Sequence, residues 1–208
     1  YAYPAQFPRD VIEAMRDEPK LCKYLDIPFQ HISDAQLKSM RRGLSKAETY
    51  ALVEELRREV PGIALRTTLL TGYPGETEAD FEELLQFVRD VRFERLGVFP
   101  YSEEEGTFSA TRLRDDIPQE VKQQRADRIM ELQSEISREN NLARIGRTEE
   151  AVIDRRENEY WVGRTQYDSP EVDTEILISS DASLQPGEFH PVEITGAEQY
   201  DLYGRIVK

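Results

Sequence analysis

The sequence predicts an α/β domain built from βα units, followed by a small antiparallel β-barrel. The clearest βα unit spans residues 65–91, where a β-branched apolar run meets the turn Gly72-Tyr73-Pro74-Gly75 and an amphipathic helix begins at once. Two more apolar runs, near 21–27 and 95–100, also lead into loops and helices. After Gly146 the chain contains only short alternating segments separated by turn residues, which is typical of a small barrel.

The α/β part is expected to be one section of a parallel βα series. We expect strands near Leu21–Ile27, Ile63–Thr71 and Arg95–Pro100, and a helix from Pro8 to about Asp17 with no strand in front of it. Because three strands cannot close a barrel, we expect further βα units ahead of residue 1. Ligands bind at the carboxyl ends of parallel strands, so any site should lie in the loops that follow them.

Capping residues mark where the helices begin. A short helix should start near Ser33, and a second at Ser45, where Glu48 completes a capping box. Thr77 should cap the third helix, with Asp80 as a weaker partner. The apolar faces of the two longer helices are Tyr50, Val53, Leu56 and Val60 in one, and Phe81, Leu84, Leu85, Val88 and Val91 in the other.

A long charged helix from Pro118 to Asn141 should join the two parts. Its apolar stripe is Val121, Ile129, Leu132 and Ile136. The barrel strands are expected at Thr148–Arg155, Tyr160–Gln166, Glu175–Ser179, Phe189–Gly196 and Leu202–Val207. We therefore expect three regions, at residues 1–117, 118–143 and 144–208.

Composition narrows the class of protein. The net charge of −14 disfavours a broad phosphate-binding surface, because nucleic-acid affinity depends on Lys and Arg, and it would attract a basic partner. No run approaches the roughly 18 apolar residues of a membrane span. The single cysteine, Cys22, rules out an internal disulfide framework and suits a reducing cytosol, so a cytoplasmic location is expected.

Candidate ligand contacts follow each strand of the α/β part. His31 lies just beyond the first strand, either as a site residue or as a loop side chain bonded to local backbone. Gly72, Pro74 and Gly75 either let the backbone approach a ligand or simply form a tight turn. Tyr101 follows the third strand, where it either lines a pocket that reads an adenine edge or lies at the surface.

Arginines give two further candidates. Arg66 lies within an apolar strand, where an unpaired guanidinium is costly. A ligand carboxylate or the nearby Asp26 would neutralise it, and we favour the ligand. Arg41 and Arg42 form a small basic spot or, more simply, favour the C-terminus of a short helix.

No reactive centre is visible in the sequence. One cysteine and two histidines cannot supply a cysteine-ligated cluster or a zinc site. Cys22 belongs to an apolar run and is expected in the core. The Walker, Gly-x-Ser-x-Gly and Gly-x-Gly-x-x-Gly motifs do not occur. We therefore expect ligand-contacting loops and no catalytic or metal-binding residues in this chain.

Six segments of the sequence carry recognisable motifs, namely Tyr24-Leu25-Asp26-Ile27-Pro28-Phe29-Gln30-His31-Ile32-Ser33, Leu37-Lys38-Ser39-Met40-Arg41-Arg42, Leu65-Arg66-Thr67-Thr68, Gly72-Tyr73-Pro74-Gly75-Glu76-Thr77, Tyr101-Ser102-Glu103-Glu104-Glu105-Gly106-Thr107 and Glu198-Gln199-Tyr200-Asp201-Leu202-Tyr203-Gly204. Together they resemble the radical S-adenosylmethionine methylthiotransferases of the RimO type. The resemblance covers the whole chain, and Pro-Phe-Gln-His is its most branch-specific motif.

The resemblance implies a fold and an activity. The chain would hold the second half of a radical SAM partial (βα)6 TIM-like barrel, a connecting helix and a TRAM domain, a small antiparallel β-barrel. The intact protein would methylthiolate the β-carbon of an aspartate in a small-subunit ribosomal protein, using S-adenosylmethionine and two [4Fe-4S] clusters. Because the cluster cysteines would lie upstream of residue 1, this chain alone should be inactive.

Only binding roles carry over to residues of this chain. By the resemblance, Arg66 would meet the methionyl carboxylate of S-adenosylmethionine, and Gln30 and His31 would face the barrel mouth. Gly72, Pro74 and Gly75 would let the backbone approach the nucleoside, and Tyr101 and Ser102 would border the adenine. These assignments are made by position in the matching motifs.

Charge distinguishes the branches of this family. Residues 144–208 contain seven Lys and Arg against fourteen Asp and Glu, a net charge of −7. This surface repels a phosphate backbone and suits a basic ribosomal protein, so nucleic acid is disfavoured as a direct substrate. The alternatives are a tRNA adenosine methylthiotransferase, whose TRAM domain should be basic, and a non-catalytic acidic binding module.

Overall fold

The computed structural model describes residues 2–180 and 183–207. The chain divides into two compact units, Tyr1–Leu21 with Leu25–Gln133, and Cys22–Tyr24 with Ser134–Lys208. The first holds the α/β sheet and the second holds the β-barrel. Each unit is described by itself below.

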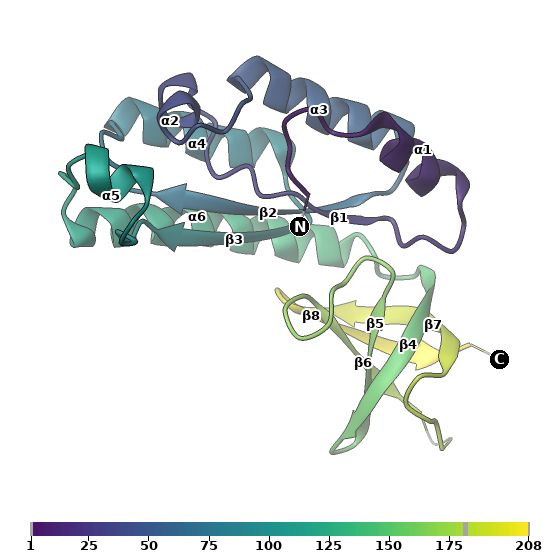
Figure 1. Cartoon of the computed structure of the whole chain (residues 1–208). Coiled ribbons are helices and arrows are strands. Elements are labelled where there is room, and N and C mark those ends of the chain that lie inside the picture. The colour runs from purple at the N-terminus through teal and green to yellow at the C-terminus, as the bar shows by residue number, and fades with distance from the viewer. Residues whose placement is uncertain (1, 181–182, 208) are drawn as a thin grey trace. The chain divides into compact units, whose positions relative to one another are not determined.

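The α/β part is built on a three-stranded sheet in the order β1-β2-β3 (Figure 1). Its strands are β1 (Tyr24–Asp26), β2 (Ala64–Thr71) and β3 (Arg95–Pro100). β2 and β3 run parallel, and an isolated parallel bridge joins Gln30 to Leu69 beyond the end of β1. The parallel βα arrangement expected from the sequence is therefore present.

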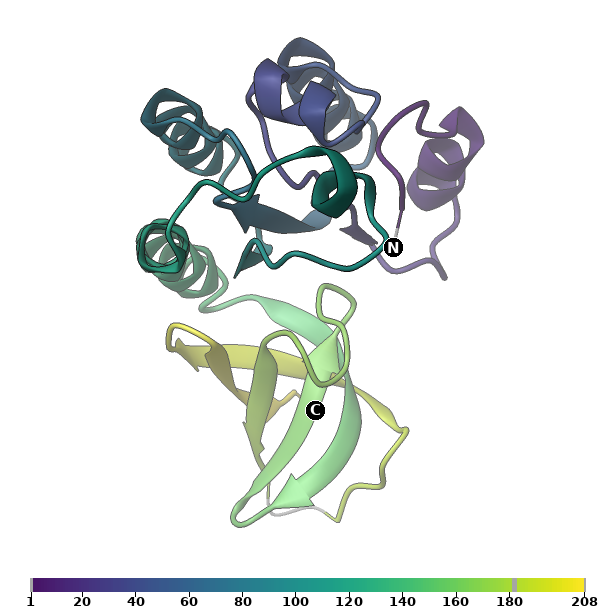
Figure 2. The ribbon, with the colours of Figure 1, turned by 60° about the vertical axis from the view of Figure 1, so that its left-hand side comes forward.

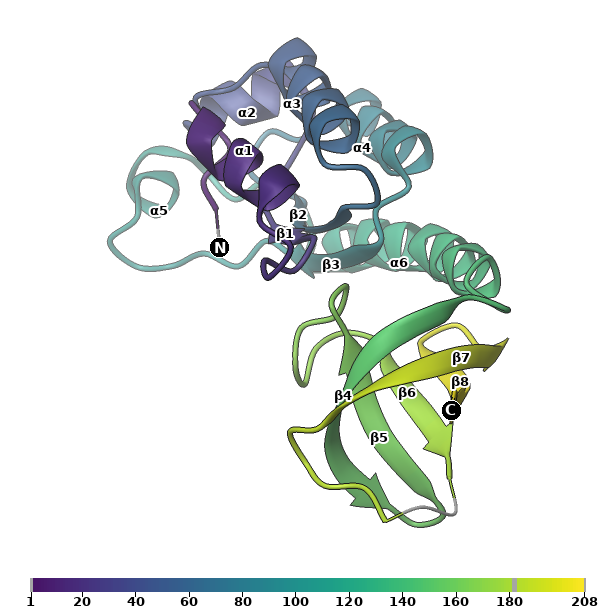
Figure 3. The same cartoon turned by 90° about the vertical axis from the view of Figure 1, so that its right-hand side faces the viewer.

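Helices α1 to α4 cover one face of this sheet, as Figures 1 and 3 show. The helices of the chain are α1 (Arg9–Asp17), α2 (Asp34–Ser39), α3 (Lys46–Glu59), α4 (Glu78–Val91), α5 (Phe108–Arg112) and α6 (Gln119–Leu142). Alternation along β2 matches this one-sided cover. Leu65, Thr67 and Leu69 are fully buried, whereas Arg66 and Thr68 on the other face are only half-buried.

Three phenylalanines form the centre of the helix-covered core. The Phe87 ring lies edge-on to Phe29, at 5.9 Å between centroids, and to Phe93, at 5.3 Å. All three side chains are fully buried. Edge-to-face contacts of this kind add about 0.5–1.5 kcal/mol beyond the burial of their area.

Both capping boxes form. The Ser45 side chain accepts the Glu48 amide while the Glu48 carboxylate accepts the Ser45 amide. Thr77 and Asp80 make the same reciprocal pair, and Asp80 also accepts a hydrogen bond from Ser33. The expected capping box at Thr77 is therefore confirmed, since the shorter side chain of Asp80 still reaches the Thr77 amide, at 2.9 Å.

The buried face of α6 differs from the predicted apolar stripe. Ile129 and Ile136 are buried as expected, but Val121 and Leu132 are only half-buried. Polar residues occupy much of the buried face, namely Lys122, Arg125, Gln133, Ser137 and Asn141. Within the first unit, these buried polar residues have partners in distant segments of the chain. Helical periodicity alone therefore could not predict that they are buried.

One local expectation is wrong. β1 starts only at Tyr24, so Cys22 precedes the strand and is exposed instead of lying in the core. A loop and then a helix follow β3, as expected, but the first helix is the short α5, whose first turn is capped by the Thr107 side chain accepting the Ala110 amide. Five residues with one large apolar side chain give too little periodicity to predict a helix.

The second unit is a closed barrel (Figure 2), whose strands, labelled in Figure 3, follow the order β4-β5-β6-β8-β7. Its strands are β4 (Thr148–Glu157), β5 (Tyr160–Thr165), β6 (Glu175–Ser179), β7 (Phe189–Ala197) and β8 (Asp201–Ile206). The barrel is not antiparallel throughout, because β6 and β8 pair in parallel. The small antiparallel barrel predicted from the sequence is present, and its one parallel pair follows because an odd number of strands in a closed ring cannot alternate direction at every pair.

The barrel interior is filled by apolar side chains from all five strands. They include Ile153, Trp161, Ile176, Ile194 and Leu202. Gly163 permits close approach of β4, since a Cβ there would lie 2.5 Å from the Val152 carbonyl oxygen.

Candidate functional site

The carboxyl ends of β1, β2 and β3 lie at one edge of the sheet, where parallel βα folds place their ligand sites. Gln30 follows β1, the turn from Gly72 to Gly75 follows β2, and Tyr101 follows β3. The Tyr101 amide donates to the Thr71 carbonyl oxygen at 2.8 Å, which joins the last two of these segments. The structure thus brings most of the predicted site residues to one edge of the sheet.

The turn after β2 requires glycine at its first position. Gly72 has φ +71°, and a Cβ there would lie 2.1 Å from Cγ of Lys122. Gly75 also has positive φ, +80°, and its amide donates to Asp116 at 3.1 Å. Pro74, between them, is buried. Close packing against α6, and not only the turn itself, therefore sets the residue at position 72.

Glu76 holds this turn from inside, a role that the sequence did not reveal. Its side chain is fully buried, and its Oε2 accepts the Gly72 amide at 2.9 Å. Its Oε1 accepts Nη1 of Arg125 at 2.7 Å, from α6. A glutamate between Pro-Gly and a helix cap carries no sequence signal of burial, because its cationic partner lies 49 residues away.

His31 is fully buried. Its Nδ1 accepts the amides of Ile32, at 2.9 Å, and Ser33, at 3.1 Å, so the neutral ring carries its proton on Nε2. That Nε2 lies 3.3 Å from Oε2 of Glu76. These local backbone contacts are the ones that the sequence left open as an alternative to a site role for His31.

Arg66 lies apart from the other predicted site residues. It is five positions before the end of β2, or roughly 16 Å at about 3.3 Å per residue. Its Nη1 is 3.2 Å from Oδ2 of Asp26, with both side chains largely buried. Of the two partners weighed from the sequence, the structure supplies the aspartate.

Tyr101 is buried, and Ser102 next to it is exposed. The Tyr101 ring packs edge-on to Tyr73, at 5.1 Å between centroids, and Nζ of Lys122 lies 4.9 Å from its centroid. Nζ also donates to the Tyr101 carbonyl oxygen at 3.3 Å and pairs with Asp115. Lys122 therefore ties α6 to the segment that follows β3.

A pocket of about 290 Å³ opens at this edge. Gln30, Leu70 and Tyr73 line it from the sheet side, Arg41 and Arg42 from the end of α2, and Phe108 from α5. We refer to it below as the α2–α5 pocket. Gln30 has φ +71°, an uncommon backbone conformation for a residue other than glycine, which turns the chain at the rim.

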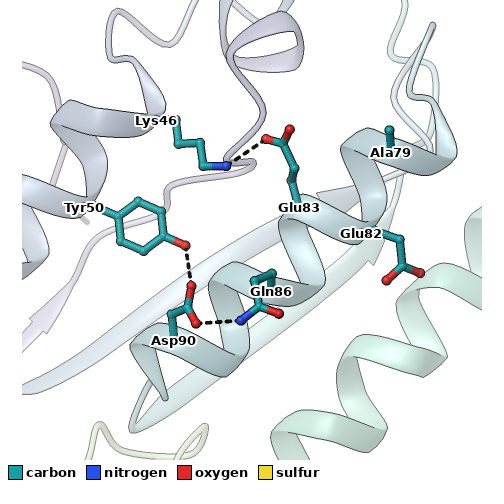
Figure 4. Close-up of a pocket in the computed structure, with 7 residues that line it drawn as sticks. All are labelled: Lys46, Tyr50, Ala79, Glu82, Glu83, Gln86 and Asp90. Atoms are coloured by element: carbon teal, nitrogen blue, oxygen red, sulfur yellow. Dashed lines mark hydrogen bonds and ion pairs between the residues drawn. The ribbon is translucent and has the colours of Figure 1, made fainter.

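A larger pocket, of about 630 Å³, lies between α3 and α4 on the helical side (Figure 4). Its polar side chains pair with one another: Lys46 with Glu83 at 3.2 Å, Tyr50 with Asp90 at 3.0 Å, and Gln86 with Asp90 at 2.6 Å. Burial, together with the hydrogen bond to Asp90, raises the pKa of Tyr50. Its polar groups are thus already satisfied within the protein.

Iron–sulfur ligands are not provided by this chain, since its one cysteine cannot supply three thiolates. Across residues 2–180 and 183–207, no group of three or more His, Cys, Asp or Glu side chains is arranged to hold a metal ion. In the same ranges, no helix is long and apolar enough to cross a membrane.

Two family models match the chain, the radical SAM superfamily over residues 3–88 and the TRAM domain over residues 145–207. Coproporphyrinogen III oxidase from Escherichia coli, described as a radical SAM enzyme, superposes with a TM-score of 0.50 at 22% identity, over 69% of this chain and 32% of that one. This likeness shows the fold alone.

Relatives in curated collections share much more sequence. The chain is 56% identical over 207 residues to ribosomal protein uS12 methylthiotransferase RimO of Parabacteroides distasonis, and 60% identical over 209 residues to the protein of the same name from Porphyromonas gingivalis. Each match covers 100% of this chain and 48% of the relative, so the chain spans about half the length of the curated relatives it matches. Over its whole length the chain thus matches the RimO branch of the radical S-adenosylmethionine methylthiotransferases, and it contains a radical SAM region and a TRAM domain.

Proposed function

We propose that the longer protein of which this chain is a part is a methylthiotransferase that modifies ribosomal protein uS12. The observation that carries the proposal is the identity of 56–60% along the whole chain to relatives of that name. The proposed target is the β-carbon of an aspartate. This chain would supply one wall of the cofactor pocket and a barrel that docks the substrate in the cytoplasm.

S-adenosylmethionine would lie at the carboxyl ends of β1 to β3. The backbone of Gly72, Pro74 and Gly75 would approach the nucleoside, and Tyr101 and Ser102 would border the adenine. Gln30 would contact the ligand from the rim of the α2–α5 pocket, which it lines. The placement of these residues after successive parallel strands supports this part of the proposal.

His31 and Arg66 take other roles in this proposal. His31 would act as a positioning residue, because its contacts reach the Ser33 amide and Glu76. Arg66 would contact a methionyl carboxylate only by giving up its pair with Asp26. We therefore propose that Arg66 chiefly holds β2 to β1.

Two iron–sulfur clusters would be held by parts of the longer protein beyond this chain. When bound, such groups supply one-electron chemistry that no amino-acid side chain offers. The residues of this chain would orient the cofactor and the target aspartate, and the buried Tyr73 and Tyr101 would help to exclude water from the edge of the sheet.

The barrel domain would dock the basic ribosomal protein. Residues 144–208 carry a net charge of −7, which favours a Lys- and Arg-rich surface and repels phosphates. Both the sign of this charge and the sequence relatives favour a protein substrate over tRNA. A non-catalytic acidic binding module has no observation in its favour.

The test is a product analysis with the full-length protein, reconstituted anaerobically with iron and sulfide and supplied with S-adenosylmethionine. uS12 and tRNA are offered separately and analysed by mass spectrometry. We expect a methylthio group in place of one hydrogen on an aspartate of uS12, with tRNA unchanged. A methylthio group on a tRNA adenosine, or cofactor cleavage with neither substrate modified, would contradict the proposal.

A further inference from the structure

We propose that the α2–α5 pocket binds the carboxylate of the aspartate that is modified, through the guanidinium groups of Arg41 and Arg42. This inference rests on the proposed function, since it identifies how the same edge of the sheet would select its substrate. The methionyl carboxylate of S-adenosylmethionine has the same chemistry, and the experiment below separates the two sources.

The charge of the pocket is unusual for this protein. The chain has 41 Asp and Glu residues and a net charge of −14, yet no carboxylate belongs to the described lining of the pocket. The charged side chains in the lining are those of Arg41 and Arg42. The electrostatic potential of the chain is negative overall. A pocket whose charged side chains are all cationic is therefore where an anionic side chain is favoured.

Arg42 is held in place without a carboxylate. Its Nη2 donates to the Pro28 carbonyl oxygen at 2.6 Å, its guanidinium lies 5.1 Å from the Tyr3 ring centroid, and the Tyr3 hydroxyl donates to its carbonyl oxygen at 2.6 Å. Its buried Nε has no hydrogen-bond partner in the described chain. Burial lowers the pKa of Arg42, as expected for a partly desolvated guanidinium that no anion compensates.

Arg41 approaches the same pocket from the next residue. Its backbone has φ +58°, and its guanidinium stacks on the Phe108 ring at 3.6 Å from the centroid. Stacking fixes the plane of the group but leaves its N–H edge available. No ion pair of Arg41 or Arg42 occurs within the part of the chain that the structure describes.

The position and size of the pocket suit a substrate side chain. Gln30 and Leu70 belong to the carboxyl edge of the sheet, so the pocket lies beside the proposed cofactor site. Its volume of about 290 Å³ is at the small end of ligand pockets and accommodates one side chain with part of its backbone. A guanidinium presents paired N–H groups that match a carboxylate and distinguish it from a neutral amide.

The test measures binding, so that it does not depend on turnover. The full-length protein is titrated with a synthetic uS12 peptide centred on the target aspartate and with the same peptide carrying asparagine there. Binding of S-adenosylmethionine is measured in parallel by equilibrium dialysis. The variants are Arg42→Gln, Arg41→Gln and the control Arg89→Gln, which removes an exposed positive charge in the last turn of α4.

We expect the wild type to prefer the aspartate peptide. Arg42→Gln and Arg41→Gln should each weaken its binding about 10- to 100-fold while leaving the asparagine peptide and S-adenosylmethionine unaffected. Arg89→Gln should change nothing. Arg41 is exposed, so its variant keeps the test valid if Arg42→Gln, which loses contacts to Pro28 and Tyr3, fails to fold.

The remaining outcomes also decide the matter. Weaker binding of S-adenosylmethionine in both pocket variants, with the peptides unaffected, would support carboxylate binding but assign it to the cofactor. Unchanged affinities for both ligands in folded variants would overturn the inference. The inference would also be overturned if the wild type bound the aspartate and asparagine peptides equally well and bound S-adenosylmethionine with the same affinity as the variants. None of these results alters the product analysis, which judges the proposed function separately.

Discussion

Glu76 and Gly72 are joined across the turn after β2, where Oε2 of Glu76 accepts the Gly72 amide at 2.9 Å. The same carboxylate pairs with Arg125 of α6 at 2.7 Å and lies 3.3 Å from Nε2 of His31. One buried carboxylate thereby links the loop after β1, the turn after β2 and α6. These contacts hold together the segments next to the proposed site.

Gly72→Ala should destabilise the protein by about 2–5 kcal/mol. The left-handed backbone costs a residue with a Cβ about 1–2 kcal/mol, and overpacking against Lys122, whose Cγ lies 2.1 Å from the added Cβ, costs about 1–3 kcal/mol more. Gly62→Ala is the matched control, because Gly62 has φ +80° and no atom within 4 Å of its Cβ position. Denaturant unfolding measures both, and equal losses would refute the role of Lys122.

Glu76→Gln should lower the unfolding free energy by about 3 kcal/mol, because it leaves the buried Arg125 without its closest counter-charge. The control is Glu78→Gln, which removes the other carboxylate that pairs with Arg125, at 3.0 Å. Glu78 is exposed, so its loss should cost less than about 1 kcal/mol. If Glu78→Gln lowered the unfolding free energy as much as Glu76→Gln, burial of the carboxylate would not determine the size of the loss.

Asp80 should make the unfolding free energy depend on pH in acid. Burial opposes ionisation, but hydrogen bonds from Ser33 and Thr77 outweigh it and lower the pKa of Asp80. A lowered pKa stabilises the folded state above the ordinary carboxyl value, and the effect disappears as pH falls through the folded value.

The measurement compares wild type with Asp80→Asn by denaturant unfolding from about pH 5 to about pH 3. We expect the advantage of the wild type to shrink across this range. An advantage that stays constant would mean that the Asp80 charge does not contribute to the capping box.

Arg66 and Asp26 should be energetically coupled. Their side chains are 3.2 Å apart and mostly buried, so a double-mutant cycle with Arg66→Gln and Asp26→Asn should give a coupling energy of about 1 kcal/mol. The single Arg66→Gln variant of the full-length protein should bind S-adenosylmethionine like the wild type. Additive losses, together with weakened cofactor binding, would return Arg66 to the ligand role considered from the sequence.

Local patterns predicted the elements well where neighbouring residues decide the structure. The Ser45–Glu48 and Thr77–Asp80 boxes each lie within four residues, and both formed. The strand ending at Thr71 and the helix beginning after Thr77 follow from the same local chemistry. The βα series and the five barrel strands could therefore be predicted from the sequence.

Features that depend on distant partners could not be predicted. Lys122 is buried because Gly72 lies 50 positions earlier and leaves room for its stem. Arg66 had two possible partners, and only the fold brings Asp26 beside it. From the sequence, Arg41 and Arg42 resembled cations at the end of a helix. The pocket that they line depends on α5, which contributes Phe108 to its lining. In each case tertiary packing sets the environment of the residue, and the neighbouring residues in the sequence give no indication of it.

The most direct test of this account with the chain itself is a titration at two salt concentrations, with uS12 and separately with a tRNA anticodon stem-loop. We expect binding to uS12 that weakens as salt rises, and no comparable binding to the RNA, because the barrel domain carries a net charge of −7. Preferential binding to the RNA stem-loop would contradict it.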